Sequence, residues 1–518
     1  MLCSRFKITP NINKNYNILR CLLSTTNVAV EWDNAQPFET LPGPKPLPIL
    51  GNAPRFLPPF GEYSGKNFLQ IYQQLQKQYG NIMVLRGLPG REPIVVTYSV
   101  NDIETMYRNE GPRPYRPGLD SLRYYRKHVR NDVHKILGLA LSQGDDWWDM
   151  RSKVNPVMMK TQSIRRYTKT VSSIADDLIK KIDILLSESD KSELPDDFLN
   201  ELFRWSLETV CAIALDTRLG CLDPNMSHDS EAQKMIDASV EMFECIYELD
   251  ILPSVWKFVS TPTLKKSIKV NDFITSYVMK HLDAAEERMK NKPSNSDHEP
   301  SILERLIVID KNVASAMVND AMIAGIETTS KTVATVMYFL ATNPNAQDKL
   351  REEINTIWPD SSTDITSKQI DQMLYLRACI KEAQRIAPVT VGTVRKLDVD
   401  VVLSGYQIPK GTDILSPNIV LCLSDKHFPQ PEKYLPERWL RSSPSELSAR
   451  NTNMFVYLPF GFGPRTCIGK RLATHEVEVL IAKLFKKYKF QWNYGPMRYT
   501  TKLLYEVADP LRFELHPV

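Results

Sequence analysis

The spacing of apolar and polar residues predicts two short strands near the N-terminal end of the chain and long helices after them. Apolar and β-branched residues fill Ile82–Leu85 and Ile94–Thr97, and the turn residues between these runs predict a β-hairpin. From about Asp145 to Lys290 the apolar residues recur at helical spacing with few helix breakers. Short strands are predicted again near Val399–Leu403 and beyond Tyr499. The pattern predicts a mainly α protein with a small β domain.

One long helix is predicted from about Asn312 to Asn343, ending before Pro344. It is apolar around most of its circumference, which predicts a course through the core. Its segment Ala324–Thr329 reads Ala-Gly-Ile-Glu-Thr-Thr. A carboxylate and two hydroxyls are costly in such a helix unless they are paired or solvated. The segment is therefore a candidate functional site, and a plain polar helix face is the alternative.

The amino-acid composition excludes several classes of protein to which the chain could otherwise belong. The chain has 518 residues, of which 42% are hydrophobic and 24% charged, enough to form a large core. Its net charge of +4 is far from the strongly basic character of nucleic-acid-binding proteins. The 8 cysteines are widely spaced and form no CxxC pair, which argues against a disulfide framework and a structural zinc site. This cysteine usage fits a reducing compartment.

The N-terminal segment has a charge bias typical of an organelle transit peptide. No acidic residue precedes Glu31, and hydroxyl-bearing residues are present. Its basic residues are Arg5, Lys7, Lys14 and Arg20. A basic tail without an address function is the alternative. No stretch approaches the ~18 consecutive apolar residues of a membrane helix. We expect residues 1–30 to form a transit peptide and residues 31–518 to form a single domain.

The segment Phe460-Gly-Phe-Gly-Pro-Arg-Thr-Cys-Ile-Gly469 surrounds Cys467 with residues that suit a metal-binding thiolate. Its glycines allow tight turns and close approach of the backbone to a flat, bulky group. Backbone N–H groups and the nearby basic residue stabilise a thiolate. The chain becomes helical from about Thr474, so the cysteine is expected just before a helix. A lone cysteine is ordinarily a small buried hydrophobe. Here no second Cys or His lies nearby to complete a zinc site, so the loop predicts a single-thiolate metal ligand.

The positions Phe460, Gly463, Arg465, Cys467 and Gly469 resemble the heme-binding signature of the cytochrome P-450 monooxygenases. The resemblance implies that these residues bind heme b and that the cysteine is the axial ligand of its iron. It also implies the cytochrome P-450 fold, in which the heme lies between a long central helix and the loop that carries the cysteine.

Two further motifs stand in the order of that family. Glu327 and Thr328 match its acid-alcohol pair on the helix over the heme, which implies a catalytic role in delivering protons to bound oxygen. Glu382 and Arg385, followed by Arg438, match its buried ion-pair triad, which implies a structural role near the heme.

Four residues match family positions that bind the two heme propionates. They are Trp147, Arg151, Arg395 and Arg465. Three cations and an indole N–H are chemically suited to two carboxylates.

The chain also resembles the mitochondrial members of the family, which take electrons from a [2Fe–2S] ferredoxin that a ferredoxin reductase reduces with NADPH. Basic residues at the docking positions are Arg377, Lys381, Lys470 and Arg471. Complementary charge would accelerate and orient this encounter. An ordinary solvated helix face is the alternative. The resemblance implies location in the mitochondrion, on the matrix side of the inner membrane, with peripheral membrane association and no transmembrane helix.

The stretches Arg108–Gly118 and Ser121–Tyr125 are similar to the insect mitochondrial group numbered family twelve, which is associated with oxidation of foreign compounds. Residues at positions that line the family's substrate pocket are Ala321, Ala324, Val391 and Thr393. Small and apolar residues there suit a lipophilic ligand.

The function expected from this resemblance is O2-dependent insertion of one oxygen atom into a lipophilic, xenobiotic small molecule. An ecdysteroid hydroxylase is an alternative within the same chemistry. An isomerase or dehydratase that uses neither O2 nor electrons is a second alternative, although such an enzyme has no use for the Glu327-Thr328 pair. A non-catalytic heme sensor or binding protein is the alternative from a different class.

Overall fold

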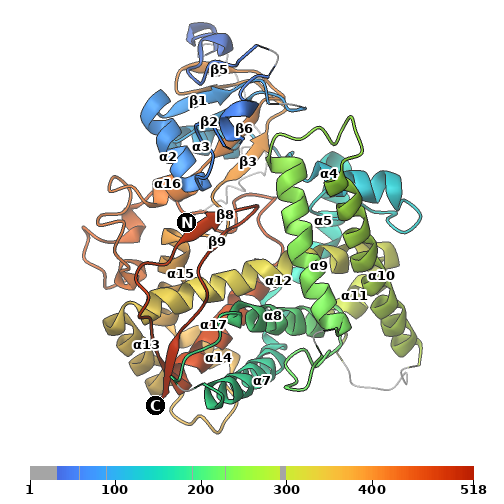
Figure 1. Ribbon diagram of the computed structural model, residues 1–518, viewed down its shortest axis with the longest axis vertical. Coiled ribbons are helices and arrows are strands. Elements are labelled where there is room, and N and C mark those ends of the chain that lie inside the picture. Colours follow the sequence, from blue (N-terminus) through green and yellow to red (C-terminus); the bar gives the residue numbers. More distant parts are fainter. Residues whose placement is uncertain are drawn as a thin grey trace, which may run out of the picture.

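The computed structural model describes residues 32–518 except for 49, 58, 89, 190, 228 and 292–298. The predicted transit peptide, residues 1–30, lies outside the described residues. Figure 1 shows a part that contains the N-terminal sheet at one end of the molecule and a larger helical part below it. The prediction of a mainly α protein with a small β domain is confirmed.

Four strands form the largest sheet, in the order β1 (Ile82–Leu85), β2 (Ile94–Thr97), β6 (Asp413–Ser416) and β3 (Thr393–Lys396). The predicted hairpin is confirmed, because β1 and β2 pair antiparallel. Strand β6 was not expected from the sequence pattern. It runs parallel to β2 and antiparallel to β3, so it joins the N-terminal hairpin to residues about three hundred positions later in the chain.

Smaller two-stranded sheets lie in the C-terminal part of the chain. They pair β4 (Val401–Leu403) with β5 (Tyr406–Ile408), β8 (Tyr499–Thr501) with β9 (Tyr505–Val507), and β7 (Tyr488–Gln491) with β10 (Glu514–Pro517). The strands predicted near Val399–Leu403 and beyond Tyr499 correspond to β4 and β8. All three pairs are antiparallel.

Helices make up most of the remaining chain. The longer ones are α2 (Phe68–Tyr79), α3 (Val100–Arg108), α5 (Gly144–Met158), α7 (Thr168–Ser187), α8 (Phe198–Ala214), α9 (Glu231–Ile246), α10 (Pro262–Lys290), α11 (Ile302–Ile309), α12 (Lys311–Ala341), α13 (Pro344–Ile357), α15 (Leu374–Ile386) and α17 (Lys470–Lys487). The short ones are α4 (Asp120–Tyr124), α6 (Thr161–Arg165), α14 (Ser367–Gln372) and α16 (Asn418–Cys422), with π-helical turns at Tyr125–Val129 and Tyr247–Ile251 and 3-10 turns at Phe38–Thr40, Ala53–Phe56, Pro436–Trp439 and Ala449–Asn451. No helix in the described part of the chain is long and apolar enough to cross a bilayer.

Helix α12 passes through the middle of the helical part and contacts α8, α10, α15 and α17 (Figure 1). Asp310 caps its first turn by accepting a hydrogen bond from the Asn312 N–H. It ends at Ala341, and Pro344 then occupies the first turn of α13, where a fixed φ and a missing N–H are tolerated. The predicted core helix is thus present at nearly the predicted bounds, and it positions the residues of the candidate site.

Helix α17 begins at Lys470, four residues before the predicted start near Thr474. Its first turn reads Lys-Arg-Leu-Ala, all good helix formers, and the Ala473 N–H donates to the Gly469 carbonyl. The helix therefore follows the cysteine loop directly.

Candidate functional site: a thiolate loop among arginines

The loop that carries Cys467 closes on itself. The Cys467 N–H donates to the Phe460 carbonyl over 3.0 Å, and Gly463 has a φ of 73°, in the left-handed region that favours glycine. A Cβ atom at this position would lie 2.1 Å from Oε1 of Glu110. The glycine therefore serves both the turn and the close approach of a buried carboxylate.

The thiol of Cys467 differs from the other five cysteines of the described residues, because its side chain is exposed whereas theirs are buried. It nevertheless lies deep in the protein, since burial is the largest influence on its pKa and raises it. The N–H groups of Gly469 and Lys470 and the guanidinium groups of Arg151 and Arg116 act in the opposite direction and stabilise the thiolate. The accessible sulfur thus faces an interior space in surroundings that suit an anionic ligand.

Arg465 is held beside Trp147, with its Cζ atom 4.2 Å from the centre of the ring. Its guanidinium donates to the carbonyls of Leu139 and Ser142 and to the Gln143 side chain over 2.6–3.1 Å. Burial lowers the pKa of Arg465 to about 9. These contacts fix the orientation of the Arg465 guanidinium at the N-terminal end of α5.

Four arginines gather around this loop. Arg116, Arg151 and Arg395 each contribute to the lowered pKa of Arg465, so the four cations repel one another. Among the described residues, Nε of Arg151 is buried without a hydrogen-bond partner, and Glu110 is the carboxylate that offsets the cluster. Such an excess of positive charge fits a bound dianion. The residues present therefore fit a heme, whose two propionates would take these charges while the cysteine takes the iron.

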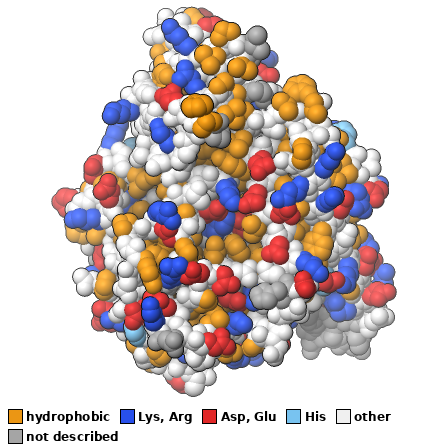
Figure 2. All heavy atoms as spheres, viewed as in Figure 1, with side chains coloured by type: hydrophobic (Ala, Val, Ile, Leu, Met, Phe, Trp, Pro, Cys, Tyr) orange, Lys and Arg blue, Asp and Glu red, His pale blue; other side chains and the backbone are white. Residues whose placement is uncertain are grey.

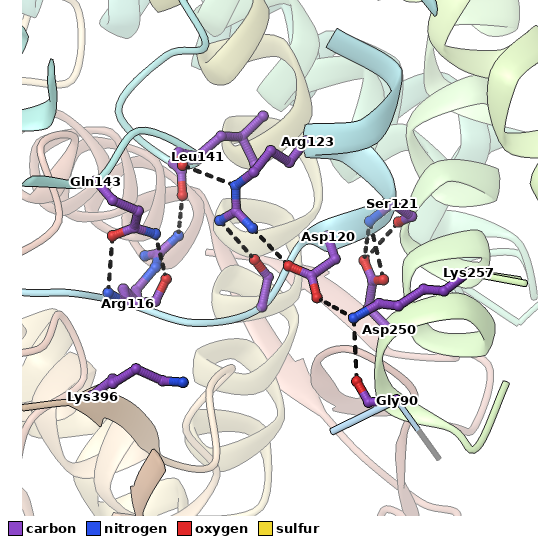
Figure 3. Close-up of polar contacts among 12 residues, drawn as sticks. Gly90, Arg116, Asp120, Ser121, Arg123, Leu141, Gln143, Asp250, Lys257 and Lys396 are labelled. Atoms are coloured by element: carbon purple, nitrogen blue, oxygen red, sulfur yellow. Dashed lines mark hydrogen bonds and ion pairs between the residues drawn. The ribbon is translucent and has the colours of Figure 1, made fainter. Parts of the chain in front are cut away.

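Arg116 belongs to this cluster and was not identified as a site residue from the sequence. Gln143 positions it by accepting from its N–H over 3.1 Å and donating to its carbonyl over 2.7 Å, as Figure 3 shows. It lies in the Pro-rich stretch that carries the resemblance to family twelve. The charge at that position was the available signal, but only the folded chain brings it next to Arg395 and Cys467.

Arg395 has a second buried partner. Its Nε donates to Oε2 of Glu110 over 2.6 Å, and both side chains are 3% exposed. The guanidinium also lies 5.1 Å from the ring centre of Tyr107. Burial raises the pKa of Glu110. Arg395, the predicted propionate ligand, is therefore already paired with a carboxylate that was not identified as a site residue from the sequence, and this pair fixes the position of Arg395 on β3.

The polar residues of α12 point in two directions. Thr328 is half-buried, and its hydroxyl donates to the carbonyl of Ala324 over 2.6 Å, whereas Ala324 is itself exposed. Glu327 is buried and pairs with Lys331 one turn later. The acid and the alcohol are thus adjacent in sequence but have different neighbours.

The predicted ion-pair triad has the geometry of a closed unit. Oε1 of Glu382 accepts from Nη2 of Arg385 over 2.8 Å and from Nε of Arg438 over 2.9 Å, and all three side chains are 0% exposed. Nε of Arg385 and the Trp439 indole donate to Oε2 of Glu382. Nη1 and Nη2 of both arginines also donate to backbone carbonyls. Complete pairing makes this buried charge tolerable.

Comparison with known proteins agrees with this geometry. The family model described as Cytochrome P450 matches residues 41–504, which is most of the chain. The chain belongs to the cytochrome P450 family. Members of this family are heme b-dependent monooxygenases, so the chain is an oxidoreductase of that class.

Three curated relatives from flies are similar over nearly their whole length. "Probable cytochrome P450 12b2, mitochondrial" of Drosophila melanogaster is 39% identical over 96% of this chain and 92% of the relative. "Probable cytochrome P450 301a1, mitochondrial" of the same species is 37% identical over 94% of this chain and 88% of the relative. "Cytochrome P450 CYP12A2" of Musca domestica is 36% identical over 96% of this chain and 94% of the relative. The resemblance to the mitochondrial insect group is confirmed.

The four predicted pocket residues of this P450 are not equivalent. Ala324 is exposed and Ala321 and Val391 are half-buried, which suits a role in lining a cavity. The Thr393 hydroxyl instead lies 2.8 Å from the Tyr107 hydroxyl and 3.1 Å from that of Ser416. Its polar atom is therefore engaged inside the sheet, and only the rest of its side chain remains for a ligand.

The predicted docking residues also divide into two kinds. The side chains of Lys381 and Lys470 are exposed. Partial burial is the main cause that lowers the pKa of Lys381, and the positive charges of Arg377 and Lys470 act in the same direction. Arg377 is 30% exposed and pairs with Asp371 and the buried Glu478. Arg471 is exposed and donates to the hydroxyl of Thr161. Arg377 is thus mainly a structural cation, and the free positive charge belongs to the lysines.

A set of polar contacts joins three segments at the sheet-bearing end (Figure 3). Lys257 donates to the Gly90 carbonyl over 3.3 Å and to Asp120 over 2.8 Å. The N–H and hydroxyl of Ser121 donate to Asp250. We call these five residues the clasp, because they tie the β1–β2 turn, α4 and the segment between α9 and α10 to one another.

Proposed function

We propose that the protein is a mitochondrial monooxygenase that inserts one oxygen atom from O2 into lipophilic foreign compounds. The observation that carries the proposal is the Cys467 loop, with its exposed sulfur, its two N–H groups at sulfur and its surplus of arginines. When bound, heme supplies the site of O2 reduction. The residues of the chain hold it, exclude bulk water and move protons.

The direct test of the ligand is Cys467→Ser. The ferrous–CO complex of the wild-type protein should show the red-shifted band of a thiolate ligand, and the serine variant should lose it. Retention of that band in the variant would contradict the assignment of the axial ligand. Measuring product formation distinguishes a heme sensor from a monooxygenase, because a sensor would form no product with any electron donor. An isomerase or dehydratase would form product without O2 or reductant.

Substrate class is tested with purified holoenzyme reconstituted with ferredoxin and ferredoxin reductase. We expect NADPH- and O2-dependent oxidation of lipophilic xenobiotics in a panel that also contains ecdysteroids. Selective oxidation of the ecdysteroids would favour the hormone hydroxylase instead. The small and apolar residues Ala321, Ala324 and Val391 support a lipophilic ligand.

We propose that Lys381 and Lys470, assisted by Arg377 and Arg471, form the docking surface for an acidic [2Fe–2S] ferredoxin. Reversing Arg377 would place a carboxylate against the buried Glu478, so the structure favours a different test. Lys381→Glu with Lys470→Glu should raise the ferredoxin concentration for half-maximal turnover and leave heme content unchanged.

The matched control reverses two exposed lysines spaced one turn apart on α10, Lys265→Glu and Lys269→Glu. Because the change in net charge is the same, equal effects of the two pairs would contradict a local docking surface. An effect of only the first pair would support it.

We propose residues 1–30 as the transit peptide, residues 31–518 as one domain, and the matrix side of the inner membrane as the location. Peripheral association is supported by apolar side chains at the sheet-bearing end, where Figure 2 shows exposed hydrophobic groups. Phe60 is 96% exposed and Phe258 is 77% exposed. Both segments adjoin the β1–β2 turn, through the hydrogen bonds of Asn52 to Gly87 and of Lys257 to Gly90.

Vesicle flotation tests this surface. Phe60→Ser with Phe258→Ser should reduce the fraction bound to vesicles of inner-membrane lipid composition, because each change removes apolar area from the bilayer contact. Val308→Ser, on α11 and 79% exposed in the wild type, is the control that should bind as before. Equal loss in the control would contradict a specific membrane surface.

A further inference from the structure

A second group of buried charges lies beside the acid-alcohol pair of α12. Nζ of Lys331 donates to Oε2 of Glu327 and to Oε2 of Glu506 on β9. The exposed fractions of these side chains are 9% for the lysine, 1% for Glu327 and 13% for Glu506. One ammonium is therefore shared between the acid of the acid-alcohol pair and a carboxylate from the C-terminal part of the chain.

The charges of this group do not balance. Two carboxylates face one ammonium, and in the described part of the chain Oε1 of Glu327 is buried without a hydrogen-bond partner. Burial, the largest influence, and the charge of Glu506 raise the pKa of Glu327 and favour its protonated form, whereas Lys331 and Lys502 favour the ionised form. The group is thus built to hold one more proton than its ion pairs require.

This group also has a route to the surface. Lys502 interacts electrostatically with Glu327 and Glu506, is 47% exposed, and pairs with Glu244 of α9, which is 39% exposed. A hollow of about 380 Å³ is lined by Phe203 and Glu244, among other residues of α8 and α9. Lys331 lies 6.0 Å from the ring centre of Phe203. Glu327, Lys331 and Glu506 are thus largely buried, whereas Lys502 and Glu244 are accessible to water.

We propose that Lys331 and Glu506 are positioning residues that resupply Glu327 with protons from water in the hollow between α8 and α9. The proposal rests on the monooxygenase function proposed above. In that reaction one oxygen atom of O2 enters the substrate, and the other takes two electrons and two protons and leaves as water.

The transfer balances in four proton movements. The carboxylic acid of Glu327 gives up its proton on the side of Thr328 and becomes a carboxylate. The ammonium of Lys331 restores that proton and becomes a neutral amine. A hydronium ion that enters beside Lys502 and Glu244 protonates the carboxylate of Glu506 and leaves as water. Glu506 then passes this proton to the amine of Lys331, so that Lys331 is again an ammonium and Glu506 again a carboxylate. The transfers from Lys331 to Glu327 and from Glu506 to Lys331 run between groups that are ion-paired in the structure. Glu244, the partner of Lys502, lines the hollow.

A purely structural tie between α12 and β9 makes a different prediction. An arginine in place of Lys331 would keep a positive charge between the two carboxylates, but it is not deprotonated in proteins. The tie would survive this substitution, whereas the proton transfer would stop. Lys331→Arg therefore separates the two roles.

The experiment uses holoenzyme with ferredoxin, ferredoxin reductase and NADPH. We expect Lys331→Arg to bind heme normally, to lower the rate of product formation about a hundredfold and to divert electrons to hydrogen peroxide. Glu506→Gln should behave alike, because the amide keeps the shape but holds no transferable acid proton. The matched control is Lys483→Arg, which changes a buried lysine near the C-terminal end of α17 that pairs with Asp176 of α7. This substitution should not change the coupling of electron consumption to product formation.

A second measurement needs no turnover. In resting holoenzyme, the carboxylic C=O infrared band that Glu327→Gln removes should shift on transfer into D2O. That shift should slow at least about tenfold in Lys331→Arg relative to wild type and to Lys483→Arg. Wild-type coupling and exchange in both Lys331→Arg and Glu506→Gln would overturn the proposal. Absence of NADPH-dependent product in the wild type would instead count against the monooxygenase function, and the exchange measurement would still decide the role of Lys331.

Discussion

Two buried ion-pair groups of this P450 have the same construction and opposite charge balance. Each joins two residues one turn apart on a helix, Glu382 with Arg385 on α15 and Glu327 with Lys331 on α12, to a third residue from a distant segment. The first places one carboxylate between two guanidiniums. The second places one ammonium between two carboxylates.

The difference decides what each group is able to do. Arginine keeps its charge at neutral pH, and in the first group every oxygen of the carboxylate is hydrogen-bonded, so this group is fixed. Lysine and glutamate both titrate, and in the described chain the second group leaves Oε1 of Glu327 without a partner. Buried charge stabilises a fold when it is saturated, and it provides proton capacity when it is one partner short.

The largest loss of stability is expected when the carboxylate is removed from the group of Glu382, Arg385 and Arg438. Glu382→Ala leaves two buried guanidiniums without their carboxylate, which should cost about 3–5 kcal/mol of unfolding free energy and reduce heme incorporation. Denaturant unfolding and the heme absorbance per protein would measure both. The control is Glu437→Ala, which removes the neighbouring but 38% exposed partner of Lys349 and should cost about 1 kcal/mol or less. Equal losses would mean that Glu382 is not held in a closed buried group.

Exchanging arginine and lysine should affect the unfolding free energy of the two groups to different degrees. Arg385→Lys removes the N–H that donates to the Cys422 carbonyl over 2.8 Å, and leaving that buried acceptor unpaired should cost about 1–3 kcal/mol. Lys331→Arg keeps its charge and should change the unfolding free energy by less than about 1 kcal/mol. A stability loss for Lys331→Arg as large as that for Arg385→Lys would erase the distinction between the groups.

Glu476 on α17 is a buried carboxyl group whose pKa is raised by burial alone, in contrast to the paired carboxylates of the two groups. Burial raises its pKa from 4.5 to about 8, with no charged group of the described chain contributing. The native state therefore keeps a proton that the unfolded chain releases between these values, and this contribution to stability declines as the pH rises through that window. Unfolding midpoints should show wild type losing stability relative to Glu476→Gln as the pH rises from 4.5 to 8. A relative gain would mean that a cation pairs with the carboxylate.

The smallest effect is expected at the surface. Lys257→Ala removes the link between the β1–β2 turn and Asp120, but both ends of the ion pair are more than a third exposed, so the unfolding free energy should change by less than about 1 kcal/mol. Amide hydrogen exchange should nevertheless increase in the β1–β2 turn and α4. Unchanged exchange there would mean that the clasp does not restrain these segments.

Several structural elements of this protein were determined by the local sequence. The β1–β2 hairpin, the apolar course of α12 and the thiolate loop before α17 each depend on residues close together in the chain, whose periodicity and turn chemistry act over a few residues. The same locality explains the error at the start of α17. The residues after Gly469 are good helix formers, and the helix begins as soon as the loop ends.

The tertiary structure decided which distant residues meet. It placed β6 between β2 and β3, brought Glu110 to Arg395 and Arg116 to the cysteine loop, and added Glu506 to the local pair of Glu327 and Lys331. No periodicity records such pairs, because the partner of a buried charge depends on where the chain returns after hundreds of residues. Identity and cofactor therefore follow from short motifs, whereas the charge balance of the site depends on the folded chain as a whole.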